Sequence, residues 1–212
     1  MKINYQALLD EELEEIQNRT DKPRLLLHVC CAPCSSYVLE YLSRYFEITV
    51  YFYNPNIYPE KEYLFRNDEL SRFIADVHQN DDIDIVSENY NDKEFYDAIR
   101  GLEHLGEKSE RCKACYRLRL ERSALYASQN GYDYFTTTLS ISPHKNADWL
   151  NEIGENCAKK YNIRHLPSDF KKKGGYKRSC DISKEYGLYR QDYCGCIFSK
   201  REAEARIRSD EK

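Results

Sequence analysis

Nine cysteines occur in this chain of 212 residues, and seven of them fall into three close groups. Closely spaced thiolates bind soft metal ions, and a pair of neighbouring thiols can store two electrons as a disulfide. The first residues are acidic and lack the apolar core of a secretory signal, so we expect a cytoplasmic protein with reduced cysteines. The spacing therefore indicates metal or redox chemistry, whereas the isolated Cys157 and Cys180 are expected to be structural.

The first two groups together predict a metal site. Cys30, Cys31 and Cys34 follow an apolar run and enter a predicted helix, whose N-terminus favours thiolates. Cys112 and Cys115 are three residues apart near the start of another predicted helix, so both sulfurs point to one side. Four thiolates from two remote groups fit zinc or an iron–sulfur cluster. Adjacent side chains are expected to diverge, which favours the cluster because it offers iron at several corners.

The third group is Cys194-Gly-Cys196, which we interpret as a redox-active pair. A disulfide across one residue closes a small strained ring and is easily reduced, and the glycine relaxes the backbone. A further metal half-site or a chance pair are the alternatives. Asp192 and Tyr193 precede this pair, and they are candidate proton donors together with His144 in an earlier loop.

A basic segment follows the last predicted strand. Residues 159–178 contain eight cations and a single anion, Asp169, in a chain whose net charge is −4. Such an asymmetry suits a phosphate backbone, and a tyrosine within it could stack on a base, although a solvated basic loop would have the same composition. The candidate RNA contacts are Lys171, Lys172, Lys173, Tyr176, Lys177 and Arg178.

These groups must be positioned by an α/β fold. Short apolar runs that read as strands alternate with amphipathic stretches that read as helices, which predicts a parallel, Rossmann-like (HUP-type) sheet with flanking helices. Ligands in such sheets bind beyond the carboxyl ends of the strands, where the first cysteine group lies. The loop there reads Cys-Cys-Ala-Pro-Cys-Ser-Ser and lacks the glycines of a phosphate-binding turn. The predicted strands are residues 24–29, 48–53, 82–87, 134–139 and 163–166.

The chain is long enough for one domain and short for two. We expect an N-terminal extension over 1–23, a single catalytic α/β domain over 24–200 with a loop-rich C-terminal cap from about 165, and a charged tail over 201–212. No apolar run approaches the roughly 20 residues that span a bilayer, so no membrane association is expected.

Six ordered motifs between about residues 24 and 200 resemble the QueH-type epoxyqueuosine reductases, and together they are far more specific than any one cysteine pair. They are His28-Val-Cys-Cys-Ala-Pro-Cys34, Tyr53-Asn-Pro-Asn-Ile-Tyr-Pro59, Cys112-Lys-Ala-Cys-Tyr116, Thr137-Thr-Leu-Ser-Ile-Ser-Pro-His-Lys145, Asp169-Phe-Lys-Lys-Lys-Gly-Gly-Tyr176 and Tyr189-Arg-Gln-Asp-Tyr-Cys-Gly-Cys196.

The resemblance implies reduction of epoxyqueuosine to queuosine at the wobble position of tRNA, the last step of that modification. It also implies a [4Fe-4S] cluster with an additional iron beside it, and an electron donor that the sequence does not identify. Carried over by position, the cluster ligands are Cys30, Cys31, Cys112 and Cys115, and Cys34 is a candidate ligand of the second metal. By the same resemblance Cys194 and Cys196 form the redox-active pair, for which Asp192 is our candidate catalytic acid.

Two other functions stay open at this point. A tRNA thiolation or sulfur-transfer enzyme on a related ATP-binding fold would also carry cysteines at the sheet edge, but it predicts a glycine-rich phosphate loop that this chain lacks. A zinc-stabilised RNA-binding module without chemistry predicts a colourless protein that contains no iron.

Overall fold

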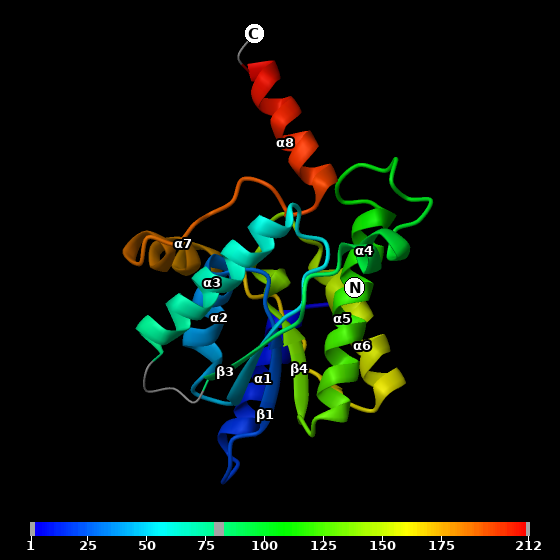
Figure 1. Ribbon diagram of the computed structural model, residues 1–212. Coiled ribbons are helices and arrows are strands. Elements are labelled where there is room, and N and C mark those ends of the chain that lie inside the picture. Colours follow the sequence, from blue (N-terminus) through cyan, green and yellow to red (C-terminus); the bar gives the residue numbers. More distant parts are fainter. Residues whose placement is uncertain (1–2, 79–82, 211–212) are drawn as a thin grey trace.

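The predicted parallel sheet is present and has the strand order of a Rossmann-like fold. A computed structural model describes residues 3–78 and 83–210, so residues 1–2, 82 and 211–212 of the predicted segments lie outside the described residues. All strand pairs are parallel, in the order β3-β2-β1-β4-β5 (Figure 1). The strands are β1 (Arg24–His28), β2 (Glu47–Phe52), β3 (Ile83–Ser87), β4 (Tyr134–Thr137) and β5 (Arg164–His165).

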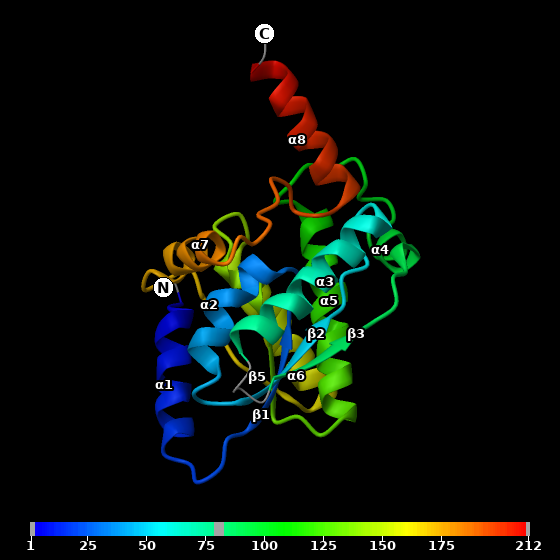
Figure 2. The same cartoon turned by 60° about the vertical axis from the view of Figure 1, so that its left-hand side comes forward.

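Helices cover both faces of this sheet, as Figure 2 shows. Parallel strands need long crossovers, and helices that bury one apolar face provide them. The helices are α1 (Tyr5–Gln17), α2 (Ala32–Leu42), α3 (Glu60–Val77), α4 (Asp92–Ala98), α5 (Glu110–Gln129), α6 (Ala147–Tyr161), α7 (Gly175–Glu185) and α8 (Ile197–Asp210), with a 3₁₀ turn at Thr138–Ile141.

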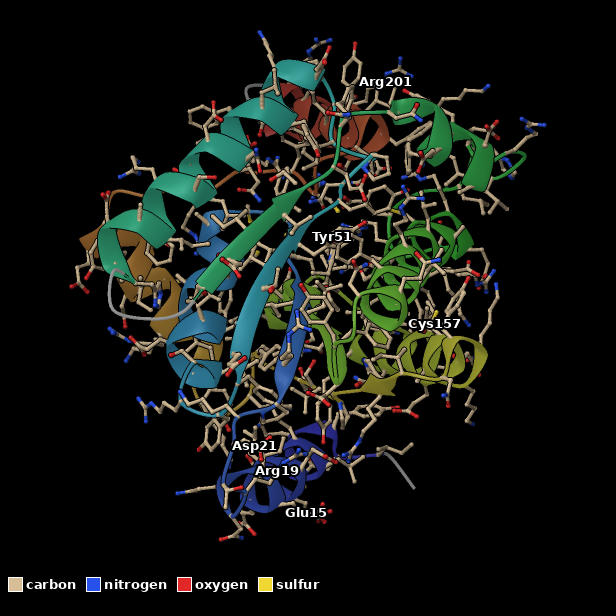
Figure 3. The ribbon with its side chains drawn as sticks, turned by 60° about the horizontal axis from the view of Figure 1, so that its bottom comes forward. Glu15, Arg19, Asp21, Tyr51, Cys157 and Arg201 are labelled. Carbon is tan, nitrogen blue, oxygen red and sulfur yellow. The ribbon has the colours of Figure 1, made fainter. Side chains whose placement is uncertain are left out.

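The side chains of β1 alternate between two buried cores, as the period of a strand requires. Leu25 and Leu27 pack in the core that α1, α2, α3 and α7 cover. Leu26 faces the other core, to which α5 and α6 contribute. Cys157 on α6 lies in that second core and is buried, which confirms its expected structural role (Figure 3).

The two ends of the chain contain helices that the sequence pattern did not assign. In α1, Leu9, Leu13 and Ile16 are buried in the first core. The segment after residue 165 includes loops, as predicted, and also α7 and α8. Helix α7 packs against α2, whereas α8 projects from the end of the molecule where the strands have their carboxyl ends (Figures 1 and 2). Within the described residues, no helix is both long and apolar enough to cross a membrane.

Candidate metal and redox site

The first cysteine group lies where β1 passes into α2, and His28 fixes the end of that strand. His28 is fully buried, its Nε2 donates to the carbonyl oxygen of Tyr53 at 3.1 Å, and its Nδ1 lies 2.8 Å from the hydroxyl of Thr137. These bonds join β1 to the ends of both neighbouring strands. Burial lowers the pKa of His28 to about 3, so the ring is neutral and structural.

Beyond this strand the sulfurs of Cys30, Cys31 and Cys34 lie within 4.8 Å of one another. Cys31 is the N-cap of α2, with Cys34 in the first turn, so the helix N-terminus supplies positive potential. The thiols of Cys30 and Cys34 donate to Cys31 and hold its pKa well below the ordinary value, and the amide of Gln191 adds a bond at 3.2 Å. The same interactions raise the pKa values of Cys30 and Cys34, so the group favours one thiolate, at Cys31.

The geometry of this group fits a metal. Tetrahedral metal–sulfur bonds of about 2.3 Å place neighbouring sulfurs about 3.8 Å apart. The sulfurs of Cys30 and Cys31 lie 3.7 Å apart, although adjacent side chains were expected to diverge. The reason is that the chain changes from strand to helix at Cys31, so the two side chains do not alternate as they would along a strand. Cys30, Cys31 and Cys34 could thus bind a metal together.

The second group lies on one face of α5. Cys112, Cys115, Tyr116 and Arg119 are spaced i, i+3, i+4 and i+7, the positions that share a helix face. Burial raises the pKa of Cys115 to about 12, which disfavours the thiolate unless a metal is bound. Within the described ranges, neither Cys112 nor Cys115 belongs to the compact group of three sulfurs.

The third group meets α5 at a small cavity. Cys112, Cys115, Cys194 and Cys196 line this space of about 20 Å³, and Arg119 contributes to its wall. Cys30 and Cys31 are not among the residues that line this cavity, so the predicted joint site of Cys30, Cys31, Cys112 and Cys115 stays a prediction. Cys194 and Cys196 are free thiols, and the glycine between them has a φ of +123°, which an L side chain rarely adopts.

The two thiols of this pair have different surroundings. The ammonium of Lys145 donates to the sulfur of Cys194 at 2.8 Å. Although burial alone would raise the pKa of Cys194, the charges of Lys145 and Arg119 hold it below the ordinary value. Cys196 is buried near Ser199, and burial raises its pKa. Cys194 is therefore the member of the pair that is ionised more readily.

A larger cavity of about 260 Å³ opens in front of these groups. Its wall joins the first cysteine group to the third, because it includes Cys30, Cys34 and Cys194. Three predicted proton donors line it too, namely Asp192, Tyr193 and His144, as does the exposed Tyr176. The hydroxyl of Tyr193 already donates its proton in a hydrogen bond to the carbonyl oxygen of Tyr58, at 3.0 Å.

The basic segment divides into paired and unpaired cations. Lys171 pairs with Asp169, Lys173 with Asp10 at 2.6 Å, and Arg178 donates to Glu40 at 3.0 Å. The last two pairs fasten α7 and the turn before it to α2 and α1. Lys172 and Lys177 are exposed, and in the described part of the chain no ion pair involves them.

Three residues of this site were missed from the sequence. Although burial alone would lower the pKa of Arg119, the thiols of Cys115, Cys194 and Cys30 raise it, so this guanidinium is close to all three groups. Its spacing of seven residues from Cys112 was the available signal. Arg66 contacts the ring of Tyr193, and Gln191 bonds Cys31, but neither position carries a pattern that a sequence could reveal.

Fold and site together define a Rossmann-like α/β protein in which a cysteine cluster able to bind metal occupies the edge where such folds bind ligands. Residues 25–202 match the family described as epoxyqueuosine reductase QueH, and the chain belongs to this family.

Relatives of that name confirm the assignment. The protein from Streptococcus pyogenes is 40% identical over 202 residues, which cover 94% of this chain and 79% of the relative. The Staphylococcus epidermidis protein is 41% identical, with coverage of 93% and 85%. The Thermotoga maritima protein is 36% identical, with coverage of 86% and 95%. The resemblance seen in the six motifs is thereby confirmed.

Proposed function

We propose that this protein is an oxidoreductase that converts epoxyqueuosine to queuosine at the wobble position of tRNA. The observation that carries the proposal is the family match over residues 25–202, which includes all three cysteine groups. The shared cavity supports it, because a substrate there would meet both the first cysteine group and Cys194. The proposal places the protein in the cytoplasm with its tRNA substrate and an electron donor still to be identified.

The reaction removes the epoxide oxygen and leaves an alkene. It consumes two electrons and two protons, and it releases water. Oxidation of the Cys194 and Cys196 thiols to a disulfide supplies two electrons and two protons, so the step balances. The disulfide must then be reduced again by the external donor before the next turnover.

A metal centre on the cysteines completes the proposal. Cys30, Cys31, Cys112 and Cys115 would hold a [4Fe-4S] cluster, with Cys34 as a ligand of an additional iron. When bound, such a centre passes electrons singly and polarises an oxygen as a Lewis acid. The close grouping of the three sulfurs of Cys30, Cys31 and Cys34 supports the presence of a metal, and the cluster type rests on the family resemblance.

The chain's own residues bind the substrate and move its protons. Lys145 holds the Cys194 sulfur toward the cavity, and Asp192 is the catalytic acid that delivers a proton to the leaving oxygen. Tyr176 lies at the cavity wall, where its exposed ring can stack on an unstacked base. Lys172 and Lys177, with the rest of the 171–178 segment, contact the phosphates of the anticodon stem-loop.

The test is turnover of tRNA that carries epoxyqueuosine, with protein purified under anaerobic conditions, followed by mass spectrometry of the nucleosides. We expect queuosine as product and iron with visible absorbance in the protein. Replacing Cys112 with serine should remove most of that absorbance and abolish turnover, whereas Cys194→Ser should keep the absorbance and lose turnover. Cys157→Ser, a buried cysteine outside the site, is the matched control and should keep both.

Three outcomes would contradict the proposal. A thiolated product or a need for ATP would favour the sulfur-transfer alternative. A colourless protein with zinc and no turnover would favour the RNA-binding module. Unchanged absorbance in Cys112→Ser would reject the ligand assignment while leaving the reaction to be judged by turnover.

A further inference from the structure

Three arginines are buried among the described residues, and they differ in what neutralises them. Arg66 pairs with Glu62 at 2.8 Å, and Arg111 with Glu202 at 3.2 Å. Arg119 is 2% exposed, and across residues 3–78 and 83–210 no ion pair joins it to a carboxylate. A buried cation without a counter-charge destabilises a fold, so the missing anion needs an explanation.

The hydrogen bonds of Arg119 also show that it lacks an anionic partner. Its Nε donates to the carbonyl oxygen of Cys115 at 3.3 Å, and its guanidinium lies 5.8 Å from the ring centre of Tyr116. Its Nη2 is buried and has no hydrogen-bond partner in the described part of the chain. A buried guanidinium whose Nη2 donor is unused can accept an anion as a partner, which these neutral groups do not supply.

The position of Arg119 indicates which anion that is. Arg119 and Cys194 line both cavities, so they lie between the Cys30 group on one side and Cys112 and Cys115 on the other. Metal–thiolate centres carry net negative charge, because each ligand is a thiolate. Cysteine sulfurs line the cavities on both sides of the guanidinium.

We propose that Arg119 is the positioning residue that supplies the fixed positive charge for an anionic metal–thiolate centre built from the cysteine groups on its two sides. The inference rests on the metal centre of the proposed function and does not depend on the substrate. A nearby cation makes the addition of an electron to such a centre easier, and it also strengthens retention of the metal. Arg119 thereby acts through the centre and not on the substrate itself.

The test compares wild type with Arg119→Met, which removes the charge but keeps the length, and Arg119→Lys, which keeps the charge. Arg122→Met is the control, because Arg122 lies on the same helix, pairs with Glu88 at 3.6 Å and is not among the residues that line either cavity. Three quantities are measured on anaerobic protein: the reduction potential of the bound centre, the rate of metal loss to a chelator, and the rise in Tm when metal-free protein is loaded.

We expect a more negative potential in Arg119→Met, roughly tenfold faster metal loss and a smaller rise in Tm on loading, with Arg119→Lys near wild type. In Arg122→Met the metal-free and the metal-loaded protein should lose equal amounts of Tm, and the potential should stay unchanged. An unchanged potential and unchanged rise in Tm in Arg119→Met would overturn the inference. Failure of metal-free Arg119→Met to fold would overturn it too, because removal of an unpaired cation should not unfold the metal-free protein.

These outcomes separate the two proposals. Wild-type protein that binds metal but leaves epoxyqueuosine unreduced would reject the reaction and leave the role of Arg119 to be decided by the potentials. Wild-type protein that binds no metal would reject the metal centre and this inference with it.

Discussion

The thiols of Cys194 and Cys196 are separated by one glycine, yet among the described residues only Cys194 accepts a hydrogen bond from a cation. Lys145 bonds Cys194 at 2.8 Å, whereas Cys196 is buried beside Ser199. The thiolate is the form of cysteine that attacks and the form that is displaced in disulfide exchange. The asymmetry therefore assigns Cys194 to contact with the substrate cavity and Cys196 to the resolving role in the proposed reaction.

Replacing Lys145 with methionine should make Cys194 less reactive at neutral pH. Burial would then act without the ammonium to oppose it, so the pKa of Cys194 rises and its thiolate fraction at pH 7 falls. We expect iodoacetamide to label the Cys194 peptide several-fold more slowly at pH 7, and the pH profile of labelling to move to higher pH. Mass spectrometry of the labelled peptide measures both.

The control for this substitution is Lys172→Met, which removes an exposed lysine of the basic segment. Its labelling profile should match wild type. An unshifted profile in Lys145→Met would show that Lys145 does not set the ionisation of Cys194, and Arg119 would then have to account for it alone.

The candidate site cysteines could be predicted from the sequence, but the residues that pack against them could not. The cysteines could be found because their close spacing is unusual. Arg66 is brought close to Cys31 and Tyr193 only by tertiary packing. These residues are far apart in the sequence and share no helix or strand periodicity that could predict the contact. Contacts of this kind depend on how α3 meets the segment before α8, which no local pattern encodes.

Among the elements, the loop that carries Cys194 and Cys196 depends on one backbone geometry. Gly195 has a φ of +123°, its carbonyl oxygen accepts from the backbone N–H of Tyr58 at 2.8 Å, and an added Cβ would lie 3.3 Å from Nη1 of Arg66. The loop is therefore tied to the segment between β2 and α3 and to a buried arginine. Only glycine allows this conformation without strain.

Gly195→Ala should disturb the redox pair more than the fold. We expect a loss of about 1–3 kcal/mol in the free energy of unfolding, the typical cost of a strained backbone position, and slower labelling of Cys194 as the loop moves away from Lys145. Urea unfolding and the peptide labelling described above measure these effects. Gly187→Ala is the control, because Gly187 also has a positive φ, +61°, but an added Cβ there meets no atom of the described residues within 4 Å.

Wild-type labelling of Cys194 in Gly195→Ala, together with a loss of stability equal to that of Gly187→Ala, would mean that the loop tolerates a side chain. The contact between Lys145 and Cys194 would then not depend on the geometry at Gly195.

The predicted elements were recovered where the sequence pattern is strong. Buried parallel strands read as short apolar runs, which is how residues 24–29 and 48–53 could be recognised. Helix α7 was missed because it begins at Gly174-Gly175 inside a lysine-rich stretch and buries only Ile182 among its large apolar residues. Helix α8 was missed because its apolar residues do not gather on one side.

The whole molecule carries a formal charge of −4, so its surface on average repels RNA. Part of the basic segment does not offset this repulsion, because the charges of Lys173 and Arg178 are already neutralised by Asp10 and Glu40. Lys172 and Lys177 lie in the same region without an ion pair among the described residues, and Tyr176 beside them lines the large cavity. We therefore expect the tRNA to bind the face that carries Lys172, Tyr176 and Lys177.

Affinity for the tRNA should consequently depend on few phosphate contacts and fall steadily with salt. Each lysine that neutralises a phosphate contributes about 0.7 to 0.9 to the slope of log affinity against log salt concentration. Lys172→Ala and Lys177→Ala should each weaken binding several-fold and lower that slope by about this amount, whereas Lys173→Ala should change it less because the lost charge was already paired. Fluorescence anisotropy with a labelled anticodon stem-loop at several salt concentrations measures the slopes. If Lys173→Ala lowers the slope as much as Lys172→Ala does, the RNA displaces Asp10 from Lys173. The ion pairs around α7 would then not determine which cations bind the RNA.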